Sequence, residues 1–206
     1  MRIVLGISGA SGVVIGIRLA EVLKELNHNV VAIVTHTALK VADSECISSE
    51  WMYKKLKELV AEVYMEDEIE APLASSSYYI DACVLSPASI KSLGMIVTGI
   101  ASNLLIRSVL NALRMGKKVV AIIREGPLGP IELRVLYQAS KMGITIMPAI
   151  IGFYTKPQNL KEIVDFIVGK VLDILGIENN LYRRWPDARR VPIPDPCSIL
   201  YGSTSS

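Results

Sequence analysis

Residues 2–12 of this chain read RIVLGISGASG, and they contain the features that decide the fold. The first part of this run, up to Ile7, is apolar and β-branched after Arg2, which predicts a buried strand. The serine- and glycine-rich part predicts a tight turn, and an amphipathic helical pattern follows over residues 14–25. A strand, a glycine-rich turn and a helix in this order direct backbone N–H groups and the positive end of the helix dipole at one place, which suits a phosphate group.

The spacing of the glycines and the end of the next strand bear on which ligand the turn would bind. The glycines lie at positions 6, 9 and 12, which is not the G-x-G-x-x-G spacing of dinucleotide sites. A tight connection without a ligand therefore stays open as an alternative. The next expected strand, residues 30–34, ends at Thr35 and His36, where a nicotinamide-binding chain carries an acidic residue. The sequence thus favours a mononucleotide such as FMN over NAD.

Composition limits the class of protein. The 206 residues suit one domain, and they are 51% hydrophobic with a mean hydropathy of +0.40. No apolar run is long enough to predict a membrane span, so we expect the excess apolar surface to lie in contacts of a homo-oligomer. The net charge of +2 gives no reason to expect nucleic acid or an anionic membrane as a partner.

The cysteines and the N-terminus bear on the compartment. Cys46, Cys83 and Cys197 are far apart, and the chain has only two histidines, so we predict neither a disulfide framework nor a metal site. The apolar stretch at the N-terminus is too short for a signal peptide. We therefore expect a cytoplasmic location.

Strand and helix patterns alternate through residue 175. This alternation predicts an α/β fold with a Rossmann-like, doubly wound parallel sheet in three α/β/α layers. We expect strands at 2–7, 30–34, 82–85, 119–123 and 144–147, and helices at 14–25, 37–42, 50–60, 90–98, 103–115, 131–142 and 160–175. Trp51 is expected to face inward, and the acidic segment 62–70 is expected to be a polar connection.

Several polar residues follow the ends of expected strands, the edge where parallel sheets place ligands. Glu45 is one, although a solvated glutamate is an equal alternative. Ser89 follows Pro87 and either caps the next helix or helps to hold a cofactor. Arg124 and Glu125 stand side by side after the strand 119–123, which indicates a functional pair.

Two further groups are ambiguous by themselves. Arg107 and Arg114 are seven residues apart and share a helical face, which fits either surface salt bridges or anion binding. The serines at 75–77 form either a flexible loop or a set of hydroxyl groups on a ligand. After Glu178 the periodicity stops, so we predict a flavoprotein domain at 1–178 and a tail at 179–206 that lies on a neighbouring subunit or is disordered.

Together, separated motifs in a fixed order resemble the UbiX/Pad1 family of flavin prenyltransferases from about Arg2 to Trp185. These motifs are Gly9–Gly12, Ser89–Ser92, Asn103–Arg107, Arg124–Leu128, Pro148, Gly152–Tyr154, Val168–Asp173 and Arg184-Trp185. The resemblance implies a metal-independent transferase that joins the dimethylallyl group of dimethylallyl phosphate to reduced FMN. It also implies a homo-oligomer, usually a dodecamer, with active sites where subunits meet, and a UbiD-type decarboxylase that receives the prenylated flavin.

The resemblance also assigns roles to residues. It implies an FMN site made of Gly9, Ala10, Ser11, Thr35, Ser89, Ile90, Lys91, Ser92 and Arg124. It implies a substrate site made of Arg114, Arg124, Glu125, Tyr154 and Lys170, with catalytic roles for Ser11, Glu45, Arg107 and Glu125. Four positions depart from common family residues: Arg114 replaces lysine, Lys170 replaces arginine, Ala88 replaces cysteine, and Ser76 replaces the glycine of a Ser-Gly-Ser loop.

Two other functions agree less well with these residues. A flavin-dependent cysteine decarboxylase of the same fold relies on a catalytic histidine and a Pro-x-Met-Asn turn, whereas this chain has Pro87-Ala88-Ser89-Ile90 and no histidine in its first helix. A non-catalytic FMN-binding protein fits the residues, but it gives no reason for four cations, Arg107, Arg114, Arg124 and Lys170, beside a flavin pocket.

Overall fold

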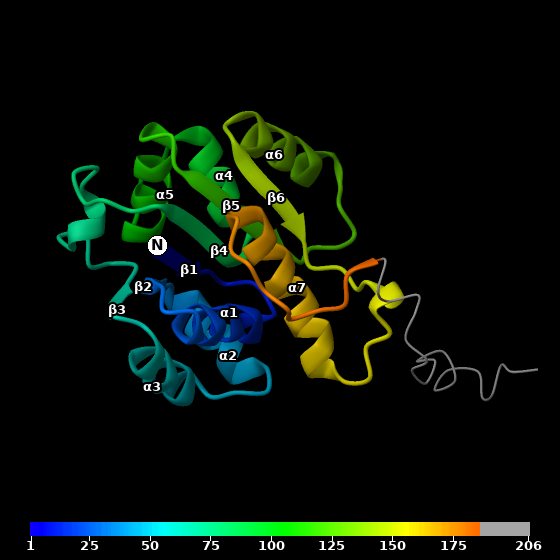
Figure 1. The fold of residues 1–206 in the computed structure, drawn as a ribbon. Helices are drawn as coiled ribbons and strands as arrows, with labels where there is room; N and C mark the ends of the chain where they lie inside the picture. The colour runs from blue at the N-terminus through cyan, green and yellow to red at the C-terminus, as the bar shows by residue number, and fades with distance from the viewer. Residues whose placement is uncertain (186–206) are drawn as a thin grey trace, which may run out of the picture. The chain divides into compact units, whose positions relative to one another are not determined.

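A computed structural model describes residues 1–185 of the chain (Figure 1). The chain divides into two compact units, Met1–Ala149 and Ile150–Ser206, and each is described by itself. The predicted boundary at residue 178 stays a prediction, and most of the predicted tail, residues 186–206, lies outside the described residues. No helix within residues 1–185 combines the length and apolar character that a bilayer crossing requires.

The first unit is built on one six-stranded sheet with the order β3-β2-β1-β4-β5-β6, and every neighbouring pair is parallel. The strands are β1 (Arg2–Ile7), β2 (Asn29–Val34), β3 (Glu62–Met65), β4 (Ala82–Ala88), β5 (Lys118–Ile123) and β6 (Ile144–Pro148). The predicted α/β fold with a doubly wound parallel sheet is confirmed. β1, β2, β4 and β5 are almost fully buried, because helices cover both faces of a parallel sheet.

The strand β3 corrects the expectation that residues 62–70 form only a polar connection. It pairs with β2 from Glu62 to Met65. Because β3 lies at the edge of the sheet, its residues are only partly buried, and Glu62 is exposed. A short edge strand needs little apolar character, which is why its composition predicted a loop.

Helices cover the two faces of this sheet in two groups (Figure 1). α1 (Val13–Glu25), α2 (His36–Ser44) and α3 (Ser49–Leu59) contact one another, and α4 (Ile90–Thr98) contacts both α5 (Leu104–Arg114) and α6 (Pro130–Lys141). The short helix η1 (Pro72–Ala74) packs against α5. In α3 the prediction for Trp51 is wrong, because Met52 and Leu56, four residues apart, take the buried face and leave Trp51 47% exposed.

The strand order reverses between β1 and β4, and the loops after these two strands are fastened together. The Ser8 hydroxyl donates to the Pro87 carbonyl oxygen at 2.9 Å and accepts from the Ser89 backbone N–H at 2.7 Å. α1 packs closely beside this point, since a Cβ on Gly16 would lie 2.3 Å from the Ser86 carbonyl oxygen. In α/β sheets this reversal is the place where ligands bind, at the carboxyl edge of the strands.

The second unit, as far as it is described, contains η2 (Phe153–Thr155) and the long helix α7 (Leu160–Leu175). Asn159 caps the start of α7, and Gly176 ends it in the left-handed conformation with φ +80°. Both ends agree with the sequence prediction.

Candidate functional site

The loop after β1 leaves backbone donors available at the carboxyl edge of the sheet. α1 begins after Gly12, which has φ +91° and provides no side-chain cap. Ala10 N–H donates to the Ser8 carbonyl oxygen, whereas within residues 1–185 the N–H groups of Gly9 and Ser11 have no hydrogen-bond partner. Uncapped donors at the start of a helix suit an anionic or hydrogen-bond-accepting ligand.

Glu45 lies at the same loop although it is 33 residues away in the sequence. Its Oε1 accepts a hydrogen bond from the Gly12 backbone N–H at 2.7 Å. Glu45 ends α2, and its side chain is half-buried. The structure therefore places a carboxylate beside Ser11, in contact with the glycine-rich turn rather than free in solvent.

Thr35 and Ser89 both cap helices at this edge. The Thr35 hydroxyl oxygen accepts from Ala38 N–H at 3.0 Å, and the Ser89 hydroxyl oxygen accepts from Ser92 N–H at 3.1 Å. Ser89 and Ser92 also share a hydrogen bond between their hydroxyl groups at 2.9 Å. Ile90 and Lys91 form the first turn of α4, with Lys91 exposed. The capping role is thus observed, and the predicted cofactor role of these residues stays a prediction.

Arg124 and Glu125 directly follow β5 at the same edge. Both side chains are exposed, and within residues 1–185 neither has an ion pair or a side-chain hydrogen bond. Because β5 neighbours β4 and β4 neighbours β1, this pair shares an edge with the glycine-rich turn. The structure therefore brings one free cation and one free carboxylate to the edge that carries Ser11 and Glu45.

Arg107 lies in the first turn of α5, and Arg114 is the last residue of this helix. This helix starts at the carboxyl edge, where Leu104 N–H donates to the carbonyl oxygen of Glu66 after β3, and it runs back to the amino edge, where Lys118 starts β5. Arg114, in its last turn, is about 15 Å along the helix axis from the start of α5. Within one chain, Arg114 and Arg124 therefore lie at opposite edges of the sheet.

A hollow of about 300 Å³ lies beside α5, and neither Arg107 nor Arg114 is among the residues that line it. Arg107 Nε donates to the Ala74 carbonyl oxygen at 3.0 Å, and Arg114 Nη1 donates to Asn111 Oδ1 at 3.1 Å. The hollow is lined by Leu73, Ser75, Ser76, Ser77, Tyr78, Tyr79, Ile80, Ser108, Asn111, Ala112, Met115 and Lys117. The serines at 75–77 thus line a cavity that is also lined by one positively charged side chain, Lys117.

In the second unit, Tyr154 and Lys170 belong to a cluster of aromatic rings. Tyr154 meets Phe166 edge to face at 5.9 Å and Trp185 at 5.3 Å between ring centroids. The Lys170 ammonium lies 5.1 Å from the ring centroid of Tyr182 and 5.8 Å from that of Phe166. Within residues 1–185 Lys170 has no carboxylate at ion-pair distance, and its ammonium group lies near two aromatic rings.

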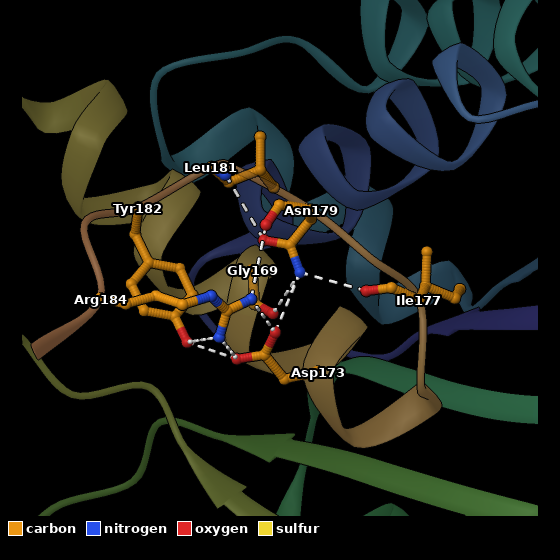
Figure 2. A network of polar contacts seen from close by, with 7 residues as sticks. All are labelled: Gly169, Asp173, Ile177, Asn179, Leu181, Tyr182 and Arg184. Carbon is orange, nitrogen blue, oxygen red and sulfur yellow. Dashed lines mark hydrogen bonds and ion pairs between the residues drawn. The ribbon is translucent and has the colours of Figure 1, made fainter. Parts of the chain in front are cut away.

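Asp173, Tyr182 and Arg184 lie near Lys170, and sequence analysis assigned no role to them. Asp173 and Arg184 nevertheless belong to two of the motifs that resemble the UbiX/Pad1 family. Figure 2 shows Asp173 at the centre of a network that includes Tyr182 and Arg184. Burial and the hydrogen bond to Asp173 raise the pKa of Tyr182 to about 12, so the phenol stays a donor. After residue 178 the sequence has no periodic pattern from which these contacts could be predicted.

Comparison with known proteins shows the family. Residues 1–172 match the Flavoprotein family. A flavin prenyltransferase UbiX from Saccharolobus solfataricus is 43% identical over 186 residues, with 89% of this chain and 92% of the relative covered. One from Methanocaldococcus jannaschii is 40% identical, with 90% and 98% covered. This chain belongs to the UbiX family of flavin prenyltransferases.

Solved UbiX structures agree with this assignment. The crystal structure of AnUbiX (PadA1) in complex with FMN and dimethylallyl pyrophosphate has a TM-score of 0.85 and 27% identity, covering 89% of this chain and 96% of that one. A dodecameric FMN-dependent UbiX-like decarboxylase from Escherichia coli has a TM-score of 0.84 and 29% identity, covering 90% and 99%. The cysteine decarboxylase TvaF is 21% identical with a TM-score of 0.59, covering 71% of this chain and 88% of that one, so it shares the fold alone. The predicted family is confirmed, and the individual site residues stay predictions.

Proposed function

We propose that the protein transfers the dimethylallyl group of dimethylallyl phosphate to reduced FMN. The observation that carries this proposal is the carboxyl edge of the sheet near the reversal of strand order. This edge carries the glycine-rich turn with Glu45 bound to it, and also Arg124 and Glu125, in a chain 43% identical to a UbiX flavin prenyltransferase. Such an edge is where α/β sheets bind mononucleotides.

The residues at this edge fit FMN. The free N–H groups of Gly9 and Ser11 and the uncapped start of α1 suit the acceptor atoms of a flavin mononucleotide, and Arg124 supplies a cation. In our proposal Ala10, Thr35 and the turn 89–92 complete this site. Reduced FMN, when bound, supplies the electron-rich ring system that accepts the allyl group.

The cations account for departure of the phosphate. Breaking the allylic C–O bond builds negative charge on the phosphate group, and fixed positive charges that face it stabilise that charge most in the transition state. We assign this role to Arg107, Arg114, Arg124 and Lys170, with Tyr154 as a hydrogen-bond donor. Lys170 is suited to it because, within the part of the chain that the structure describes, no carboxylate neutralises it.

We assign proton transfer to two carboxylates, Glu45 and Glu125. Closing a new ring on the flavin removes a proton from it, and a carboxylate within hydrogen-bond reach serves as the base. Glu45 is held beside Ser11 by the Gly12 N–H, and Glu125 neighbours the phosphate-binding Arg124 in our proposal. Within residues 1–185 no group of three or more His, Cys, Asp or Glu side chains could hold a metal ion.

We further propose that each site takes residues from more than one copy of the chain. Arg114 and Arg124 lie at opposite edges of one sheet, so both reach one phosphate group only if Arg114 comes from a neighbouring copy. Exposed apolar residues on α6, namely Ile131, Leu133 and Tyr137, support a homo-oligomer, and the dodecamer of the E. coli relative is the assembly we propose.

The proposed function also implies a protein that receives the prenylated flavin and a cellular compartment in which the reaction takes place. A prenylated flavin is of use only to an enzyme that binds it, and we propose a UbiD-type decarboxylase as that partner. Cys46 and Cys83 are free thiols, which supports a reducing, cytoplasmic location. A non-catalytic FMN-binding protein is the second candidate, since the residues that fit FMN would serve it equally.

One experiment separates the two candidates. Purified protein is incubated without oxygen with reduced FMN and either dimethylallyl phosphate or dimethylallyl pyrophosphate, and the released flavin is weighed by mass spectrometry. We expect a flavin heavier by one dimethylallyl unit with the monophosphate. Unmodified FMN with both donors at saturation would leave only the binding protein.

A further inference from the structure

The Asp173 carboxylate is fully engaged by donors from the segment that follows α7 (Figure 2). Arg184 binds both of its oxygens, with Nη2 2.9 Å from Oδ1 and Nη1 3.2 Å from Oδ2. Asn179 Nδ2 donates to Oδ1 at 3.0 Å, and the Tyr182 hydroxyl donates to Oδ2. Two parallel N–H···O bonds from one guanidinium are the strongest common geometry for such a pair.

Lys170 is the natural competitor for this carboxylate. It precedes Asp173 by three residues on α7, and side chains three apart on a helix are neighbours that pair when their charges are opposite. Yet Lys170 lies against the rings of Tyr182 and Phe166 instead. The Tyr182 ring is seated tightly there, because a Cβ on Gly169 would lie 2.5 Å from its Cδ1.

We propose that Arg184 is a positioning residue that keeps Asp173 away from Lys170. By occupying both oxygens of Asp173, Arg184 leaves the Lys170 ammonium without a carboxylate partner and so available to the phosphate group of the substrate. The inference rests on the proposed function of Lys170 in binding that phosphate. In the prenyl transfer described above, neither Asp173 nor Arg184 has a role. Positioning by Arg184 explains why the chain carries both residues.

Asp173 can compete with the substrate phosphate for the Lys170 ammonium group only if its carboxyl group is ionised. Partial burial on its own raises the pKa of its carboxyl group, but hydrogen bonds from Arg184, Tyr182 and Asn179 more than offset this, and the pKa lies below its ordinary value. Asp173 is therefore ionised at neutral pH. Without Arg184, an anion would stand one helical turn from Lys170 and compete with the phosphate.

The test is a rescue experiment on the full chain. Arg184→Gln is expected to raise KM for dimethylallyl phosphate by about tenfold and to lower kcat as well, because Lys170 paired with Asp173 would hold the phosphate group less well in both the ground state and the transition state. Adding Asp173→Asn to Arg184→Gln removes the competing carboxylate and is expected to return KM to within about threefold of wild type. Calorimetric titration of dimethylallyl phosphate into protein loaded with oxidised FMN measures the same affinities without turnover.

Matched variants make the outcome decisive. Glu178→Gln removes an exposed carboxylate of the same segment that has no partner within the described residues, so the double variant Glu178→Gln/Arg184→Gln should stay as weak as Arg184→Gln. Arg184→Lys, which keeps the charge but not the two parallel hydrogen bonds, should give an intermediate KM if Arg184→Gln proves unstable.

The results that overturn the inference differ from those that overturn the function. If Arg184 only fastens the segment, or itself binds phosphate, Asp173→Asn will fail to rescue Arg184→Gln. An unchanged KM in Arg184→Gln and Arg184→Lys would also refute the proposed role. Failure of the proposed function is seen separately, as wild-type protein that forms no prenylated flavin.

Discussion

Glu125 is the carboxylate whose role can be tested most directly at the scale of a single residue. It is exposed at the end of β5 and, within residues 1–185, forms no side-chain hydrogen bond or ion pair that its removal would disturb. The neighbouring Arg124 is assigned to FMN and phosphate in our proposal. A change at Glu125 should therefore affect proton transfer more than folding or flavin binding.

We predict that Glu125→Gln lowers turnover by about 10²- to 10⁴-fold, the usual contribution of a positioned acid or base. FMN affinity, measured by fluorescence titration, should stay within about threefold of wild type. Glu70→Gln, at an exposed position without a partner in the described residues, is the control and should leave both quantities unchanged. A Glu125→Gln protein that cannot retain FMN would show that Glu125 belongs to the flavin site.

At the scale of elements, the position of α1 decides where its N-terminus and the glycine-rich turn lie. α1 approaches β4 so closely that Gly16 leaves no room for a side chain beside the Ser86 carbonyl oxygen. Gly94, inside α4, is the matched case, because nothing lies within 4 Å of a Cβ placed there and its φ is not positive. The same substitution should therefore have opposite effects in the two helices.

We predict that Gly16→Ala destabilises the protein by about 1–3 kcal/mol, since backbone atoms must shift to admit the methyl group. It should also weaken FMN binding, because α1 carries the turn. Gly94→Ala should stabilise the protein by about 0.5–1 kcal/mol through the lower entropy of the unfolded chain. Urea unfolding at one fixed protein concentration measures both. Equal stability of the two variants would show that α1 does not pack on β4 as described.

At the scale of the whole molecule, the placement of the cations predicts an active site shared between copies. Arg114 lies near the amino edge of the sheet, whereas Arg124 and Glu125 lie at the carboxyl edge. If one phosphate group contacts all three, two copies of the chain must contribute. Variants defective at different edges should then complement each other within one oligomer.

We predict that Arg114→Ala and Glu125→Gln, each nearly inactive alone, regain activity when the two chains are expressed together. In a random mixture about a quarter of the sites would combine an intact Arg114 from one copy with an intact Glu125 from another, so about a quarter of wild-type activity is expected. Mixing the two proteins without subunit exchange is the control and should give no gain. Absence of recovery in a verified mixed oligomer would place both residues in one chain's site.

The sequence also predicted helix ends accurately where local chemistry decides them. Asn159 caps α7 through its own side chain, a short-range hydrogen bond that depends only on neighbouring residues, and Gly176 ends the same helix. The edge strand β3 and the outward Trp51 were missed because neither depends on local pattern. β3 exists because β2 is beside it, and Trp51 is exposed because Met52 and Leu56 fit the core better.

The sequence alone determined the alternation of strands and helices, and with it the parallel sheet and the edge at which Ser11, Ser89, Arg124 and Glu125 gather. This follows because periodicity fixes each element, and parallel pairing then brings all strand ends to one edge. Only the tertiary structure decided the contact between Glu45 and the Gly12 N–H, the separation of Arg114 from Arg124, and the capture of Asp173 by Arg184. Those three depend on where distant segments cross, which no local pattern encodes.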